Sequence, residues 1–135
     1  MKLTRASSYA IQAVVYMASQ KPLDKPVASH VIAESRKIPE RFLLKVLKPL
    51  VSAEVLHSIK GPNGGYRLAK PANEITMLKV IEAVDGPIRG MAPPNSKDPH
   101  NPLNKRLEHV CSQISEQMRK QLEKVKVSEL VKEKD

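Results

Sequence analysis

Three basic residues recur at helical spacing near the middle of the chain. Arg41, Lys45 and Lys48 stand at positions i, i+4 and i+7, so in a helix they would form one basic stripe. Guanidinium and ammonium groups arranged in this way bind phosphates and the acceptor edges of bases. The residue types therefore predict binding to a nucleic acid. The alternative is an ordinary solvated face without a partner.

A second polar group follows the stripe. Lys60, Asn63, Gly64 and Arg67 surround a glycine-rich turn, in which Asn-Gly is a strong hairpin signal. Basic side chains beside a turn whose glycines admit close backbone approach suit contact with a phosphate backbone or a minor groove. The turn alone also explains the glycines.

Few residues offer catalytic or metal chemistry. His109 and Cys111 are two positions apart, so on a helix they would point about 200° apart, and His100 lies in a proline-rich stretch. One cysteine cannot form an internal disulfide and cannot supply the ligands of an iron–sulfur cluster. We find no paired carboxylates, no nucleophile motif and no phosphate-binding glycine loop before a helix. We therefore expect no enzyme, no catalytic residue, no metal site and no cofactor.

Length and charge narrow the class of protein. The chain has 135 residues, which suits one domain or one small domain with an appendage, and its formal net charge is +9. Residues 1–70 hold twelve Lys or Arg against four Asp or Glu, whereas residues 71–135 are nearly neutral. A basic half of this kind points to a polyanionic partner, and we expect double-stranded DNA.

Other features of the composition exclude further classes. Aromatic residues make up only 3% of the chain, too few for a platform that stacks single-stranded nucleic acid or sugars. No apolar run approaches the roughly 20 residues that span a bilayer, and no signal peptide is visible. With its single cysteine, the chain is expected to be soluble and cytoplasmic, with no membrane partner.

The basic stripe needs helices to position it. Apolar spacing predicts helices over residues 4–20, 27–35 and 39–53, with Thr4 as the first N-cap and Pro39 in the first turn of the third helix. Pro49 is expected to kink or loosen the last turn of that helix. The residues predicted to face inward are Ala10, Ile11, Val14, Val15, Met17, Ala18, Val27, Val31, Ile32, Phe42, Leu43, Val46, Leu47 and Leu50.

The period then changes to that of strands. Residues 55–60 and 66–69 are predicted to pair as a hairpin around the turn at 61–65. Thr76 can cap a helix over residues 77–84. The inward residues expected in that helix are Leu78, Ile81 and Val84.

Three helices followed by a hairpin form a winged helix-turn-helix, so the predicted fold class is mainly α. We expect this DNA-binding domain to span residues 1–85, with the second helix of the motif in the major groove and the hairpin as a wing. Residues 86–102 hold five of the eleven prolines and are predicted to form a flexible loop.

A long helix is predicted over residues 103–127, within a C-terminal unit of residues 103–135. Its apolar positions recur every three or four residues, which is close to the heptad seam of paired helices. We expect a homodimer through this seam. The interface residues are Leu103, Leu107, Val110, Ile114, Met118, Leu122 and Val125.

Several segments resemble one family. Residues 59–68 read IKGPNGGYRL and resemble the wing of the bacterial Rrf-two type of transcription regulators. The opening MKLTR with Tyr9, the helix after the wing with its closing Asp-Gly, and the end VKVSEL at 125–130 are similar to the same family. The similarity covers most of residues 1–130.

The resemblance implies a homodimeric transcription regulator, usually a repressor, on a pseudo-palindromic operator. It assigns Arg41 and Lys45 to base contacts and Lys60 to a basic wing position. Ser8 and Tyr9 match positions in the first helix that lie close to phosphates. The C-terminal helix would cross to the partner subunit.

The chain also departs from the family. Leu44 stands at a recognition position that is polar in the iron–sulfur regulator, and Glu54 stands where the family usually has Gly. Well-known members carry three cysteines in the segment equivalent to residues 86–106, where this chain has none. We therefore expect no cluster, and regulation by another route: a small ligand, a protein contact or simple abundance. The alternative function is a basic winged helix without operator specificity, either RNA-associated or architectural.

Overall fold

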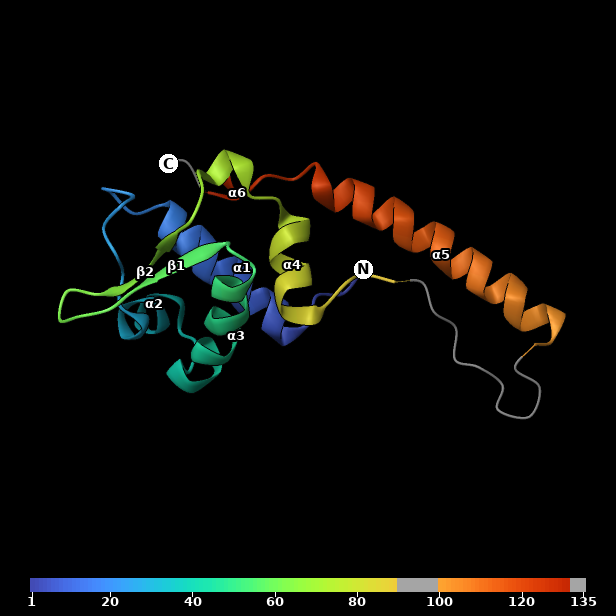
Figure 1. Ribbon diagram of the computed structural model, residues 1–135, viewed down its shortest axis with the longest axis horizontal. Helices are drawn as coiled ribbons and strands as arrows, with labels where there is room; N and C mark the ends of the chain where they lie inside the picture. Colours follow the sequence, from blue (N-terminus) through green and yellow to red (C-terminus); the bar gives the residue numbers. More distant parts are fainter. Residues whose placement is uncertain (90–99, 132–135) are drawn as a thin grey trace.

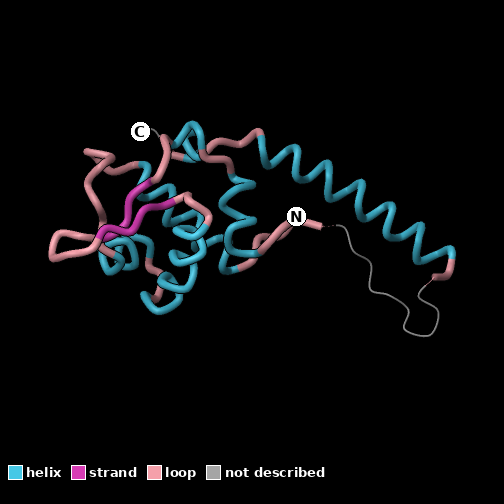
Figure 2. Tube along the Cα trace, in the orientation of Figure 1, coloured by secondary structure: helices cyan, strands magenta, loops and turns pink. Residues whose placement is uncertain are grey.

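The computed structural model describes residues 1–89 and 100–131. Most of these residues are helical, and one two-stranded antiparallel sheet accompanies the helices (Figure 2). The mainly α, winged helix-turn-helix class is confirmed. The elements are α1 (Arg5–Ala18), α2 (Ser29–Arg36), α3 (Glu40–Ser52), β1 (Leu56–Ile59), β2 (Gly65–Leu68), η1 (Ala72–Glu74), α4 (Met77–Asp85), α5 (Pro102–Glu123) and α6 (Val127–Leu130).

Helix α1 runs through the main core. Its N-cap is Thr4, as predicted, whose side-chain oxygen accepts a hydrogen bond from the backbone N–H of Ser7. One face of α1 is fully buried against α2, α3, α4 and α6. The buried residues of α1 are Ser7, Ala10, Ala13, Val14 and Met17. Because four of these five side chains are small, neighbouring helices can approach α1 closely.

Helices α2 and α3 form the helix-turn-helix pair. The turn between them contains Lys37 in the left-handed conformation and the buried Ile38. Across this turn, Oγ of Ser29 donates a hydrogen bond of 2.7 Å to Oε2 of Glu40, so the first residues of the two helices are tied together. These contacts set the angle at which α3 leaves the body of the domain.

Two predictions about α2 are wrong. Val27 packs against the core as predicted, but it precedes the helix and pairs as a bridge with Tyr66, with both backbone hydrogen bonds at 2.8 Å. Val31 is 37% exposed, because the neighbouring Ile32 and Ala33 are the residues that fill the core. The helix accordingly begins two residues later than predicted and buries less apolar surface.

Helix α3 buries one strongly apolar face. Leu43, Val46, Leu47 and Leu50 are all at most 4% exposed. Pro49 does not end the helix, since α3 continues to Ser52 and the N–H of Ala53 bonds to the carbonyl of Pro49. Phe42, predicted to face inward with these residues, is half-buried.

The hairpin is held to the body of the domain through its second strand, which contacts the α1–α2 connection. Leu56 pairs with Leu68 and Ile59 with Gly65 in the antiparallel register. Gly65 has a φ of +149°, and a Cβ atom there would lie 2.3 Å from the carbonyl oxygen of Val27. Only glycine fits where the wing joins the α1–α2 connection, so this position fixes how the hairpin leaves the core.

Glu54 lies in the turn that leads from α3 into the hairpin. Its φ is +61°, a left-handed conformation that disfavours side chains with a Cβ. The family that the sequence resembles usually has glycine at this position, and the left-handed backbone conformation explains that preference. The turn retains its left-handed form although the residue is glutamate.

The C-terminal segment returns to the core. Helix α5 ends at Glu123, so the predicted helix to residue 127 is wrong. The chain then pairs with the segment before α4: the N–H of Met77 bonds to the carbonyl of Val125 and the N–H of Val127 to that of Ile75, both at 2.8 Å. Val127 is 1% exposed within the main core.

The predicted seam of α5 divides into two parts. Met118 and the buried Leu122 pack on Leu78 and Ile81 of α4, and Arg119 forms an ion pair with Glu82. The other part projects from the domain (Figure 1) and leaves its apolar residues exposed. These exposed residues are Leu103, Leu107, Val110 and Ile114.

Candidate nucleic-acid interface

The outward face of α3 is basic. Arg41, Lys45 and Lys48 are all exposed and lie opposite the buried face of the helix, together with Leu44. The one acidic residue of the first turn, Glu40, is hydrogen bonded to Ser29. The predicted stripe therefore exists as a surface of positive charge, and the one carboxylate of the same helix already has a partner.

Phe42 organises two of these cations. The guanidinium carbon of Arg41 lies 4.7 Å from the centre of the Phe42 ring, and Nζ of Lys45 lies 5.6 Å from it. Both are within the range of cation–π attraction, which contributes about 0.5–1 kcal/mol at exposed sites. The ring thus restricts the directions in which the two cations extend.

The start of α1 adjoins this face. Arg5, Tyr9, Phe42 and Lys45 line a shallow, mainly apolar pocket of about 210 Å³ between α1 and α3. Tyr9 and Lys45, which were predicted separately, are therefore brought together. Ser8 lies elsewhere on the helix surface, where its Oγ accepts a hydrogen bond of 3.1 Å from Nε2 of Gln12.

The wing presents a second set of polar groups. Lys60 and Asn63 are exposed at the hairpin tip, whereas Gly64 and Arg67 are half-buried. Arg67 stands opposite His57 in the register of the sheet. A Cβ atom on Gly64 would lie 2.1 Å from the carbonyl oxygen of Ile59, so the tight turn itself requires glycine there.

These surfaces occupy one end of the molecule. Figure 1 shows α2, α3 and the hairpin at the end opposite to the projecting end of α5. A helix with an exposed basic face and a neighbouring hairpin are the two parts that a winged helix offers to a duplex. The arrangement is suited to bind phosphates and base edges.

Two members of this surface were missed by the sequence reasoning. Arg5 lines the α1–α3 pocket, and its signal was a basic residue in the first turn of the first helix. Phe42 was assigned to the core because its spacing matches that of Leu43 and Val46. Its position next to Arg41 and three residues before Lys45 was the available signal for a ring beneath two cations.

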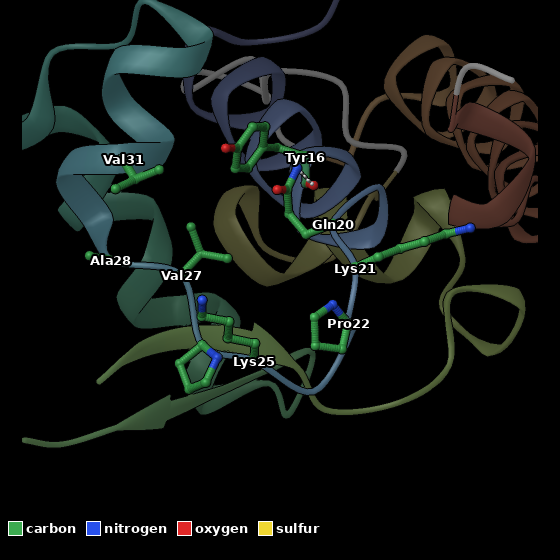
Figure 3. Close-up of a pocket in the computed structure, with 9 residues that line it drawn as sticks. Tyr16, Gln20, Lys21, Pro22, Lys25, Val27, Ala28 and Val31 are labelled. Carbon is green, nitrogen blue, oxygen red and sulfur yellow. Dashed lines mark hydrogen bonds between the residues drawn. The ribbon is translucent and has the colours of Figure 1, made fainter. Parts of the chain in front are cut away.

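A separate cavity lies where α1 ends and α2 begins (Figure 3). Its volume is about 270 Å³, and none of its nine lining residues is a carboxylate, an imidazole or a thiol. Tyr16 forms one wall, with Val27 and Val31 nearby, and the side chain of Lys21 extends away from them. The cavity offers none of the usual general acids, bases or metal ligands except phenol and ammonium groups.

Residues 1–89 and 100–131 contain neither a metal-binding cluster nor a helix that could span a membrane. No group of three or more His, Cys, Asp or Glu side chains is placed to hold a metal ion in this part of the chain. Cys111, the single cysteine of the sequence, is half-buried on α5. No helix within the same residues is both long enough and apolar enough to cross a bilayer.

Solved structures share the whole fold. CymR, the global cysteine regulator of B. subtilis, superposes with a TM-score of 0.79 at 23% identity, covering 100% of this chain and 99% of that one. The T. potens IscR superposes with a TM-score of 0.73 at 21% identity, covering 96% and 85%. At these identities the likeness establishes the fold.

Curated relatives match this chain over a shorter stretch than the solved structures do. Protein aau3 of Rhizobium meliloti is 35% identical over 85 residues, which are 63% of this chain and 54% of the relative. IscR of Photobacterium profundum is 38% identical over 85 residues, which are 63% and 49%. The matched region thus spans about half the length of these relatives.

The matching family is described as an iron-dependent transcriptional regulator. The residues of this chain do not fit an iron site of the cluster type, because such a site needs several converging thiolate or imidazole ligands and the sequence has one cysteine. His100 and His109 belong to no such group in the described part of the chain. The family profile nevertheless matches residues 3–133, so the chain belongs to the Rrf2 family of transcriptional regulators.

Proposed function

We propose that the chain is a sequence-specific regulator of transcription that binds double-stranded DNA in the cytoplasm as a homodimer. The observation that carries this proposal is the exposed basic face of α3 beside a hairpin with Lys60 at its tip. Helix α3 enters the major groove, and the wing contacts the flanking backbone. Repression, the usual mode in the family, is part of the proposal.

The dimer is supported by the exposed half of α5. Four aliphatic side chains on that half are between 43% and 55% exposed. Contiguous apolar surface on a projecting helix favours association with another helix, because pairing removes this surface from water. The other half of α5 is anchored on α4 by Leu122 and Arg119. In a dimer joined through α5, the two α3 helices would therefore lie at a fixed distance from each other.

The alternative function is nonspecific binding by a basic winged helix. Nonspecific binding requires positively charged side chains, but it does not require that these side chains have fixed orientations. Here Arg41 and Lys45 lie in the first half of α3, from which recognition helices reach base edges, and Phe42 restricts both cations. These observations favour readout of sequence.

The experiment compares two alanine variants on duplexes obtained by selection from a random library. Arg41→Ala should cost about 1–3 kcal/mol at one base pair and relax the preference there. Lys60→Ala should weaken all duplexes alike and reduce the slope of log K against log salt by about one unit.

Three results would contradict this proposal. Selection could yield no preferred sequence, single-stranded RNA could compete as well as the selected duplex, or Arg41→Ala could leave both preference and affinity unchanged. The first two outcomes would favour the nonspecific alternative. The third outcome would show that α3 is not part of the DNA interface.

A further inference from the structure

Leu44 is an exposed apolar residue at the edge of a basic surface. It is 43% exposed, whereas Leu43 and Leu47 on the same helix are completely buried. The core contacts of α3 are made without it. An exposed leucine needs no explanation by itself, but this one lies beside the cations on the face that the proposed function directs into the major groove.

Arg41 and Lys45 extend away from this side chain. At about 100° per residue, Phe42 and Leu44 project roughly 160° apart, on either side of the stripe. Arg41 and Lys45 both lie over the Phe42 ring, at 4.7 and 5.6 Å from its centre. Their polar ends are therefore drawn to the side away from Leu44, and the leucine methyl groups stay available.

The major groove offers one apolar feature of unmodified bases. It is the C5-methyl group of thymine, which distinguishes a T·A pair from the other three arrangements. A leucine side chain cannot donate or accept hydrogen bonds, so contact with this methyl group is the specific recognition open to it. A protein partner would instead require a broader apolar patch than one leucine among lysines.

We propose that Leu44 is a specificity-determining residue that contacts the C5-methyl group of a thymine in each operator half-site. This inference rests on the proposed function, because it requires α3 in the major groove. It predicts a selected half-site with a thymine whose methyl group contributes to affinity only when Leu44 is present.

The experiment is a double-mutant cycle that combines a substitution of Leu44 with removal of a methyl group from the DNA. Each thymine of one half-site in the selected duplex is replaced singly by uracil, which removes only the methyl group. Wild-type protein and Leu44→Ala are titrated with each duplex. At one position, uracil should weaken wild-type binding about 3- to 10-fold and Leu44→Ala binding less than twofold.

Two further variants serve as controls. Leu23→Ala removes another exposed leucine, 52% exposed in the α1–α2 connection, and should retain the wild-type response to uracil. Leu44→Met keeps an apolar side chain and should retain most of the wild-type loss of affinity when thymine is replaced by uracil. Circular dichroism and melting confirm that each variant is folded, as expected for exposed positions.

The outcomes separate the inference from the proposed function. If wild-type protein prefers the selected duplex but no thymine shows a methyl effect that depends on Leu44, the inference is wrong and the proposed function stands. A half-site without thymine would also overturn the inference. If no duplex is preferred at all, the proposed function fails first.

Discussion

Removal of the Asp85 carboxylate should destabilise the domain strongly. Asp85 ends α4 but interacts with the start of α1, 78 to 81 positions away in sequence. Oγ of Ser7 donates a hydrogen bond of 2.5 Å to Oδ2 of Asp85, and Oγ1 of Thr4 lies 2.9 Å from the same oxygen. Thr4 also accepts from the N–H of Ser7, so the three residues form one capping network.

The magnitude follows from burial. Ser7 is 0% exposed, so Asp85→Ala would leave a buried hydroxyl without its acceptor. Loss of a hydrogen bond to a charged group costs about 1.5–3 kcal/mol, and the more exposed Thr4 contact adds up to about 1 kcal/mol. We expect Asp85→Ala to lower the free energy of unfolding by about 1.5–4 kcal/mol. Ser7→Ala should cost only about 1 kcal/mol, because water can solvate the exposed Asp85.

The assay is urea unfolding followed by circular dichroism, at one fixed protomer concentration because dimerisation would contribute to stability. Asp24→Ala is the matched control, since this exposed loop carboxylate should change stability by less than about 0.5 kcal/mol. In the double variant, the loss should fall short of the sum of the single losses by about 1–2 kcal/mol. A loss below about 0.5 kcal/mol for Asp85→Ala, or strict additivity with Ser7→Ala, would refute this reasoning.

Three other changes test separate parts of the structure. Glu54→Gly should stabilise the chain by about 0.5–1 kcal/mol in the same urea assay, because the residue has a φ of +61°, and any destabilisation would contradict a strained turn. Leu107→Glu places a charge on the exposed apolar half of α5, so it should weaken self-association, measured by sedimentation, at least tenfold. Lys105→Glu changes another face of the same helix and should leave the dimer intact. After anaerobic cluster reconstitution, the protein should not contain near-stoichiometric iron and sulfide. If it does contain them, and Cys111→Ser removes them, the chain has cluster ligands that its sequence does not reveal.

Local signals in the sequence predicted the local structure well. The N-caps Thr4 and Thr76 were found because a hydroxyl before an apolar periodic segment satisfies a backbone N–H of the first turn. The hairpin was found because Asn-Gly and alternation mark a short turn between strands. The basic face of α3 follows from spacing alone, since its apolar residues leave only one face for Arg41, Lys45 and Lys48.

Contacts between distant segments could not be predicted in this way. The spacing of the α5 seam continues to Val125, but periodicity does not reveal whether an apolar side chain faces its own chain or another. Leu122 packs on α4, and Val125 accepts a backbone hydrogen bond from Met77. The Asp85 network likewise has no local signal, because its partners lie at the opposite end of the domain in sequence. Which base α3 contacts depends on the conformation of each exposed side chain, and the spacing of residues in the sequence does not determine that conformation.

In the proposed complex, α3 lies in the major groove of each half-site of a two-fold symmetric operator. A direct test tethers an iron–EDTA cleavage reagent at α3 in a Cys111→Ser background, through Lys48→Cys, with Lys120→Cys on α5 as the control; both side chains are exposed. We predict strong cleavage from position 48 in two symmetric clusters, one in each half-site of the selected duplex, and little cleavage from position 120. Cleavage without symmetry or sequence preference, or equal cleavage from both positions, would show that α3 does not lie in the groove.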